Sequence, residues 1–317
     1  MQPGVYVKGY FSFLDCAGLW LYAETLMDNH KKAVIYALTA CLIWGTVYVA
    51  IRVGLAHGWG PLTFAGIRFL LGGVILLAIA RAKGVLSFTR RDLWVICLFG
   101  LVQTGIQNAL FFSGVKLTSA GISAIFINTQ PFFVILMAPL FFHSSKITVQ
   151  RLIGVLIGFG GVFLTAFRHG MVSGSHELGI ILLVISAISW AGSNIAVKKI
   201  LPGRDALTFT GLQMAAGALP LLVVGLIVEG GQGHSADTAG WLVLAYLVIF
   251  ATSIPFFAWF KALQLGEVGR VSVFSFMLPV LGVVSGWALL GEPVNANIFL
   301  GMAMVASGIV IVNWKTG

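Results

Sequence analysis

Charged residues are scarce in this sequence, and their scarcity excludes a soluble globular protein. Only 9% of the 317 residues are charged, whereas 59% are hydrophobic, and the mean hydropathy is +1.00. A soluble domain of this size must present a polar surface to water. The few charges separate apolar runs of roughly 18 to 24 residues, about the length that crosses ~30 Å of hydrocarbon as an α-helix. The sequence therefore predicts an integral membrane protein.

Acidic residues are absent from the middle of every apolar run. All ten Asp and Glu residues lie in the N-terminal segment, in connections or at helix ends. This placement excludes an intramembrane carboxylate that alternately binds a proton and a cationic substrate. The runs also lack a nucleophile paired with a base, paired acids or metal ligands, so an intramembrane enzyme is disfavoured and no cofactor or metal is expected. A simple channel remains an alternative, which saturable exchange of a labelled metabolite would distinguish from a carrier.

Cysteine is also rare, and its spacing does not indicate a metal site. The three residues Cys16, Cys41 and Cys97 are odd in number and show no metal-ligand spacing. We interpret them as small apolar packing residues. Residues 1–30 lack the pattern of a cleaved secretory signal and are expected to form a cytoplasmic or interfacial segment.

The continuous apolar runs favour helices over the alternating strands of an outer-membrane barrel. The sequence predicts an all-α integral membrane protein with ten transmembrane helices, near residues 33–52, 62–80, 93–115, 120–142, 150–167, 178–197, 207–228, 240–262, 271–290 and 297–314.

The Lys and Arg residues behind the net charge of +9 are divided unequally between the two sides of the membrane. With the N-terminus inside, 15 of the 19 Lys and Arg residues fall in inside segments and three fall in outside segments. This positive-inside bias predicts that both termini are cytoplasmic, in the inner or plasma membrane. The basic balance is thus explained by topology, and no nucleic-acid partner is expected.

The second half of the chain repeats the first at an offset of 145 to 148 residues. The aligned pairs include Trp44 with Trp190, Arg52 with Lys198, Pro131 with Pro279 and Gly154 with Gly301. The two repeats are predicted to cover residues 31–170 and 178–317. Because each contains five spans, the second must enter the membrane from the opposite side. Inverted repeats of this kind are a recurrent plan of transporters, with the substrate between the halves near the midplane.

Several short motifs stand out in the spans and connections. They are Trp-Gly at 44–45, Ile-Arg-Phe at 67–69, Ala-Gly-Ile-Ser-Ala at 120–124 with Gln-Pro at 130–131, and Leu-Gly-Glu-Pro at 290–293. Taken together, these motifs resemble the EamA family of the drug/metabolite transporter superfamily. The resemblance extends over about residues 31–317 and implies an exporter-like fold whose central cavity is lined by spans 1, 3, 4, 6, 8 and 9. One departure is His-Ser-Ser at 143–145, where the family often has a Glu matching Glu292.

Arg68 is the one charge placed deep in a predicted span. An unpaired cation at such depth costs a few kcal/mol, so it must find water or acceptors. It has either a structural role, bonding carbonyls or reaching the nearer membrane face, or it binds a substrate carboxylate. Its counterpart in the repeat is the uncharged Gln213.

Uncharged polar and aromatic residues inside the spans are the candidate substrate-binding residues. Amides in hydrocarbon are costly unless they face a partner or a wet cavity, and aromatic rings can form apolar pocket walls. For each residue, ordinary interhelical packing is the alternative. The candidates are Trp44, Tyr48, Gln107, Asn108, Asn128, Gln130, Trp190, Asn194, Ser253, Trp259 and Ser275.

These features predict a transporter of a small neutral or zwitterionic metabolite such as an amino acid, an exporter by resemblance, working by alternating access. A drug, multidrug or nucleoside exporter is the alternative. The expected partners are a small-molecule substrate and membrane lipids. Glycines in spans 5 and 10 allow close helix contact within a monomer, or between the subunits of a homodimer.

Overall fold

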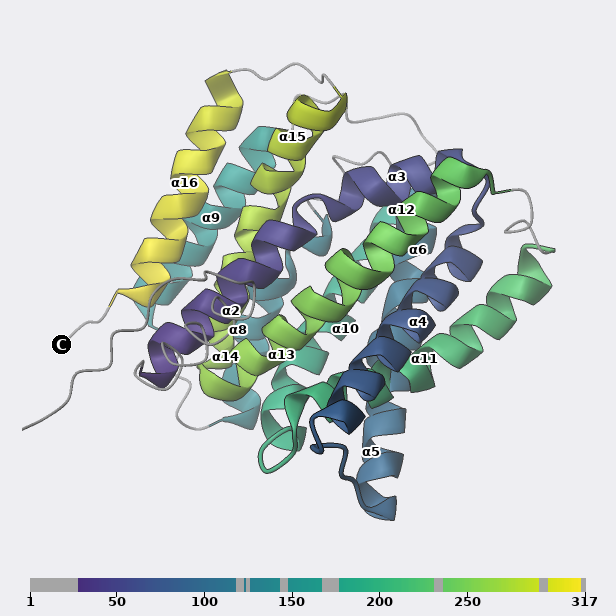
Figure 1. Ribbon diagram of the computed structural model, residues 1–317. Helices are drawn as coiled ribbons and strands as arrows, with labels where there is room; N and C mark the ends of the chain where they lie inside the picture. The colour runs from purple at the N-terminus through teal and green to yellow at the C-terminus, as the bar shows by residue number, and fades with distance from the viewer. Residues whose placement is uncertain are drawn as a thin grey trace, which may run out of the picture.

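The computed structural model describes residues 28–117, 123, 126–142, 148–166, 177–230, 236–290 and 296–314, which form helices and, within these ranges, no strand (Figure 1). Most of the predicted N-terminal segment 1–30 and the motif residues at 143–145 and 291–293 lie outside them. The first half contains α2 (Asn29–Trp44), α3 (Val47–Ala56), α4 (Pro61–Ala82), α5 (Arg90–Gly100), η1 (Leu101–Ile106), α6 (Gln107–Leu117), α8 (Gln130–Phe141) and α9 (Val149–Ala166). The second contains α10 (Glu177–Ile200), α11 (Ala206–Val228), α12 (Thr238–Val248), η3 (Ile249–Ser253), α13 (Ile254–Leu265), α14 (Val268–Ser272), η4 (Val273–Phe276), α15 (Met277–Leu290) and α16 (Ala296–Asn313).

Seven helical stretches in the described part of the chain are long and apolar enough to cross a membrane. They are Asn29–Ala56, Pro61–Ala82, Arg90–Leu117, Glu177–Ile200, Ala206–Val228, Thr238–Leu265 and Val268–Leu289. Three shorter apolar helices, Gln130–Phe141, Val149–Gly161 and Phe299–Val312, overlap the other three predicted spans. The multi-pass membrane architecture is therefore confirmed, whereas the number of ten spans stays a prediction.

The distribution of side chains suits lipid as the surrounding solvent. Large apolar side chains face outward, among them Leu98 at 64% and Ile227 at 76% exposure, while polar side chains such as Gln213 and Thr104 are fully buried. Within a bilayer, polar groups must find partners inside the protein, and the apolar surface meets acyl chains at no cost.

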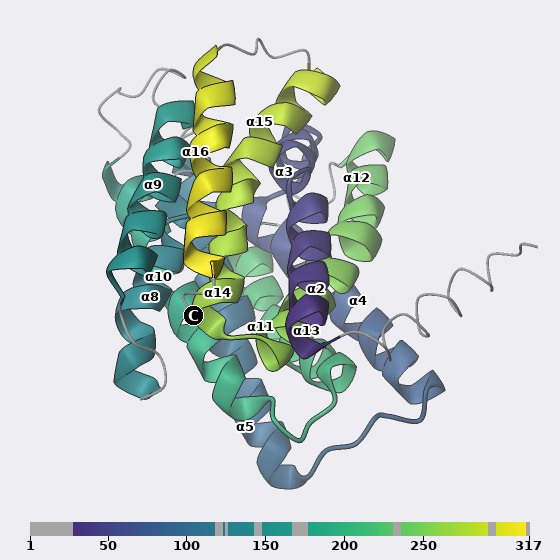
Figure 2. The same cartoon turned by 90° about the vertical axis from the view of Figure 1, so that its left-hand side faces the viewer.

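Two helix pairs approach closely because glycines line their contacts. α4 packs on α11, and α9 packs on α16 (Figures 1 and 2). A Cβ on Gly308 would lie 2.5 Å from the carbonyl oxygen of Gly154 and 2.8 Å from the backbone nitrogen of Gly158. The glycines of predicted spans 5 and 10 thus serve packing within the chain.

Two further contacts between the halves involve helices that the repeat relates to each other. α2 packs against α13, and α10 packs against α6. α2 and α10 belong to the first span of each repeat, and α6 and α13 belong to the third. The first span of each half therefore packs against the third span of the other half.

The connections gather at two ends of the bundle. At one end, Arg204 Nε donates to Asp92 Oδ1 at 2.9 Å. At the other, His57 Nδ1 lies 2.8 Å from Asp237 Oδ2. Hydrogen bonds from the Gly240 N–H and from His57 hold the pKa of Asp237 below its usual value. Such contacts fix which helix ends lie together.

Candidate functional site

A π-helical turn interrupts the third span of each half at an equivalent position. The turns are η1 and η3, and they begin 148 residues apart, as the repeat alignment requires. In each, a side chain bonds a carbonyl five residues earlier: Asn108 Nδ2 donates to Gln103 O at 3.1 Å, and Ser253 Oγ donates to Val248 O at 3.0 Å. Such turns widen a helix, are rare and are frequent at functional sites.

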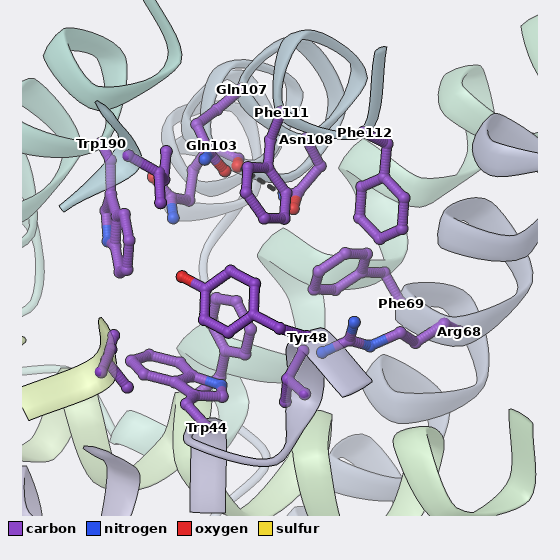
Figure 3. A pocket seen from close by; sticks show the side chains of 14 residues that line it. Trp44, Tyr48, Arg68, Phe69, Gln103, Gln107, Asn108, Phe111, Phe112 and Trp190 are labelled. Carbon is purple, nitrogen blue, oxygen red and sulfur yellow. Dashed lines mark hydrogen bonds between the residues drawn. The ribbon is translucent and has the colours of Figure 1, made fainter. Parts of the chain in front are cut away.

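A cavity of about 70 Å³ lies beside the first of these turns, between the two halves (Figure 3). Its walls come from helices of both repeats and comprise Trp44, Val47, Tyr48, Arg68, Phe69, Gln103, Gln107, Asn108, Phe111, Phe112, Ile127, Trp190, Phe256 and Leu278. One water molecule needs roughly 10–15 Å³ of such space, so the cavity can hold several water molecules. Ligand pockets usually measure roughly 300–1,000 Å³, so a metabolite requires a wider state of the same cavity.

Aromatic rings form most of the apolar wall. Trp44 contacts Trp190 edge-to-face, with ring centroids 5.9 Å apart, and Phe256 at 5.0 Å. Trp259 lies behind Trp44 at 5.6 Å, is fully buried and donates from Nε1 to Asn194 Oδ1 at 3.0 Å. The repeat-related Trp44 and Trp190 thus meet at the cavity.

Three amides, those of Gln103, Gln107 and Asn108, contribute polar atoms to the lining of the cavity. Gln107 Nε2 donates to Ser186 Oγ at 3.0 Å, and Ser186 Oγ donates back to Gln107 O at 3.0 Å. Two further polar atoms are buried and have no hydrogen-bond partner among the described residues, namely Gln103 Oε1 and Trp190 Nε1. An unpaired buried acceptor and an unpaired buried donor beside one cavity are suited to a polar ligand or to water.

Arg68 both bonds a neighbouring helix and lines the cavity. Its Nε donates to Thr252 Oγ1 at 2.6 Å and its Nη2 to the Ala251 carbonyl at 3.0 Å, and the residue is only 3% exposed. The repeat-related pair is also hydrogen-bonded, with the direction reversed, since Thr104 Oγ1 donates to Gln213 Oε1 at 2.7 Å. A carbonyl bond, one of the alternatives that the sequence left open for Arg68, is present, and Arg68 also lines the cavity.

The sequence model of the EamA-like transporter family matches this chain twice, over residues 31–167 and 177–314. The chain belongs to the EamA-like transporter family. Its members are transporters, so the chain is classed with transporters and not with enzymes, and the resemblance seen in the sequence motifs is confirmed.

Individual relatives match over nearly the whole EamA-like region. "Uncharacterized transporter YvbV" of Bacillus subtilis strain 168 is 25% identical over 92% of this chain and 94% of that protein. A protein of Escherichia coli strain K12 named "Probable amino-acid metabolite efflux pump" is 29% identical over 89% of this chain and 94% of its own length. A solved crystal structure matches with a TM-score of 0.77 at 19% identity, covering 89% of this chain and 97% of that one, so the two share a fold.

The structure brings together six of the twelve residues singled out from the sequence: Trp44, Tyr48, Arg68, Gln107, Asn108 and Trp190 line the cavity. The other six lie outside its lining: Asn128, Gln130, Asn194, Ser253, Trp259 and Ser275. Most of these bond neighbouring helices, as in the contact of Ser275 Oγ with Gln130 Oε1 at 3.2 Å, although Asn128 Nδ2 reaches the Tyr48 hydroxyl at 3.4 Å.

Sequence reasoning missed mainly the apolar lining. Phe111 follows Gln107 by four residues and Phe69 follows Arg68 directly, so proximity to the polar candidates was the available signal. Phe256 and Leu278 carried no such signal, because apolar residues occupy every face of a membrane helix.

Proposed function

We propose that this EamA-like protein exports a small neutral or zwitterionic metabolite, such as an amino acid, by alternating access between two inverted repeats. The observation that carries the proposal is the cavity, which combines aromatic walls with amides and lies where both halves meet. The reciprocal packing of α2 on α13 and of α10 on α6 supports inverted repeats. The name of the Escherichia coli relative supports the substrate class.

The orientation we propose puts both termini in the cytoplasm of a cell with the protein in its inner or plasma membrane, as the basic bias indicates. The units we propose are residues 31–170 and 178–317, working as a monomer or as a homodimer.

A nucleoside or multidrug exporter is the second candidate. Seven of the fourteen lining residues are aromatic, and flat aromatic ligands would stack on such walls.

The test is counterflow in proteoliposomes with a panel of labelled amino acids, nucleosides and cationic drugs, with and without a pH gradient. We expect saturable exchange of an amino acid that a pH gradient changes at most modestly, because none of the described acids lines the cavity. Strict proton exchange, or saturable transport of drugs or nucleosides alone, would contradict the proposal.

A further inference from the structure

Arg68 carries a buried positive charge that no described carboxylate neutralises. The four ion pairs among the described residues join Asp92, Asp237 and Glu267 to other bases, at the ends of the bundle. Among the described residues, Arg68 bonds one hydroxyl through Nε and one carbonyl through Nη2, and both partners are neutral. Nη1 makes no hydrogen bond to a described residue, so its N–H groups can donate to a ligand.

The repeat shows that the structural contact at this position does not require the charge. Gln213 occupies the position equivalent to Arg68 and reaches Thr104, the counterpart of Thr252, through an amide. Burying a cation is costly in a membrane protein, and such residues usually serve function. The charge of Arg68 is therefore surplus to the packing that both halves share.

The charge is also directed at the cavity. Figure 3 shows the guanidinium of Arg68 turned inward beside the ring of Phe69, whose centroid lies 5.1 Å from its Cζ. Gln103 and Trp190, which carry the unpaired acceptor Oε1 and the unpaired donor Nε1, line other parts of the cavity. Apart from the amides of Gln107 and Asn108, the rest of the lining is aromatic and aliphatic. The cavity thus has one cation, no described anion, an acceptor and apolar walls.

We propose that Arg68 binds the carboxylate of the substrate, which makes small carboxylates with an apolar body the substrate class of this cavity. Amino acids with apolar side chains fit, because an ammonium group can donate to the acceptor while the side chain meets the aromatic wall. Lipophilic cations do not fit, since the guanidinium repels them in a site of low dielectric. The inference deepens the proposed function and rests on it.

The test measures equilibrium binding to the purified full-length protein by its intrinsic tryptophan fluorescence. The probes with a carboxylate are L-phenylalanine, L-leucine and 3-phenylpropionate. The comparison probes, which lack the carboxylate, are L-phenylalaninamide and phenethylamine. The variant is Arg68→Gln, because the contact of Gln213 with Thr104 indicates that glutamine can keep the bond to Thr252. Arg81→Gln makes the same change at an exposed position of the same helix and serves as the matched control.

We expect the parental protein and the Arg81→Gln variant to bind the probes with a carboxylate more tightly than the comparison probes without one. Arg68→Gln should weaken carboxylate binding by about tenfold or more and leave binding of the amide and the amine unchanged or tighter, while Arg68→Lys should retain part of the preference. The proposal is overturned if the parental protein shows no carboxylate preference, or if Arg68→Gln, with unchanged thermal stability, weakens both kinds of probe equally or neither.

These outcomes separate the two proposals. If the protein transports amino acids but binds probes with and without a carboxylate equally, only the proposed role of Arg68 is refuted. A failure to transport any amino acid, with carboxylate binding that depends on Arg68, would refute the proposed substrate and leave the anion site standing.

Discussion

Two buried glutamines illustrate how one residue type takes different roles in this protein. Gln107 lines the cavity and bonds Ser186, whereas Gln130 is fully buried away from the cavity and accepts a bond from Ser275. Both are amides inside apolar helices, so sequence reasoning treated them alike. Their neighbours in space, which the linear sequence does not encode locally, assign one to the cavity and the other to interhelical packing.

Substituting these glutamines separates the two roles. Gln107→Ala should lower the apparent affinity for the transported substrate by about 5- to 150-fold, because a ligand group left unpaired in a buried site costs about 1–3 kcal/mol. Gln130→Ala should leave affinity near the parental value and lower thermal stability instead. The measurement is the initial rate of counterflow against substrate concentration, normalised to the amount of reconstituted protein. Equal affinity losses in the two variants would contradict this assignment.

At the scale of elements, the membrane helices form where the apolar runs predicted them, but their irregularities were not predicted. Proline is tolerated in the first turn of a helix, and α8 begins at Gln130 after a turn at 128–129, with Pro131 in the first helical turn. Nothing in the local sequence indicated the π-helical turns η1 and η3. A π-turn depends on carbonyl partners such as the side chains of Asn108 and Ser253, and sequence periodicity does not register them.

The contact between α9 and α16 gives a prediction about glycine. Gly308→Ala should lower the Tm, because its Cβ would collide with backbone atoms of Gly154 and Gly158, which cannot move aside as a side chain can. The expected cost is about 1–3 kcal/mol. Gly192→Ala is the control, since its Cβ would meet only Met137 Cε at 4.0 Å, and alanine favours a helix.

Thermal unfolding in detergent, followed by the loss of the monodisperse gel-filtration peak, checks this prediction. Gly192→Ala should match or exceed the parental Tm. A Gly308→Ala protein as stable as the control would show that α9 and α16 do not pack this closely.

At the scale of the whole molecule, the duplication was legible in the sequence and explains the site. The alignment of Trp44 with Trp190 and of Arg68 with Gln213 came from the repeat, and the structure brings the first pair together and gives the second equivalent contacts. What the repeat could not predict is where the symmetry breaks. The cavity takes its polar atoms mainly from the first half, because Gln107 and Asn108 align with apolar residues in the second.

The central claim is that this cavity is the path of the substrate, and blocking it chemically is the most direct test. Val47 is 8% exposed and lines the cavity. In a protein whose native cysteines are replaced by alanine, Val47→Cys places a thiol there, and Arg81→Cys places one on the exposed end of α4 as a control.

The measurement is counterflow of the labelled amino acid after treatment with a methanethiosulfonate reagent, with and without excess substrate during treatment. We predict that modification of Val47→Cys abolishes transport, that substrate slows the modification, and that the modified Arg81→Cys protein transports at its untreated rate. Complete modification of Val47→Cys with undiminished transport would contradict the account.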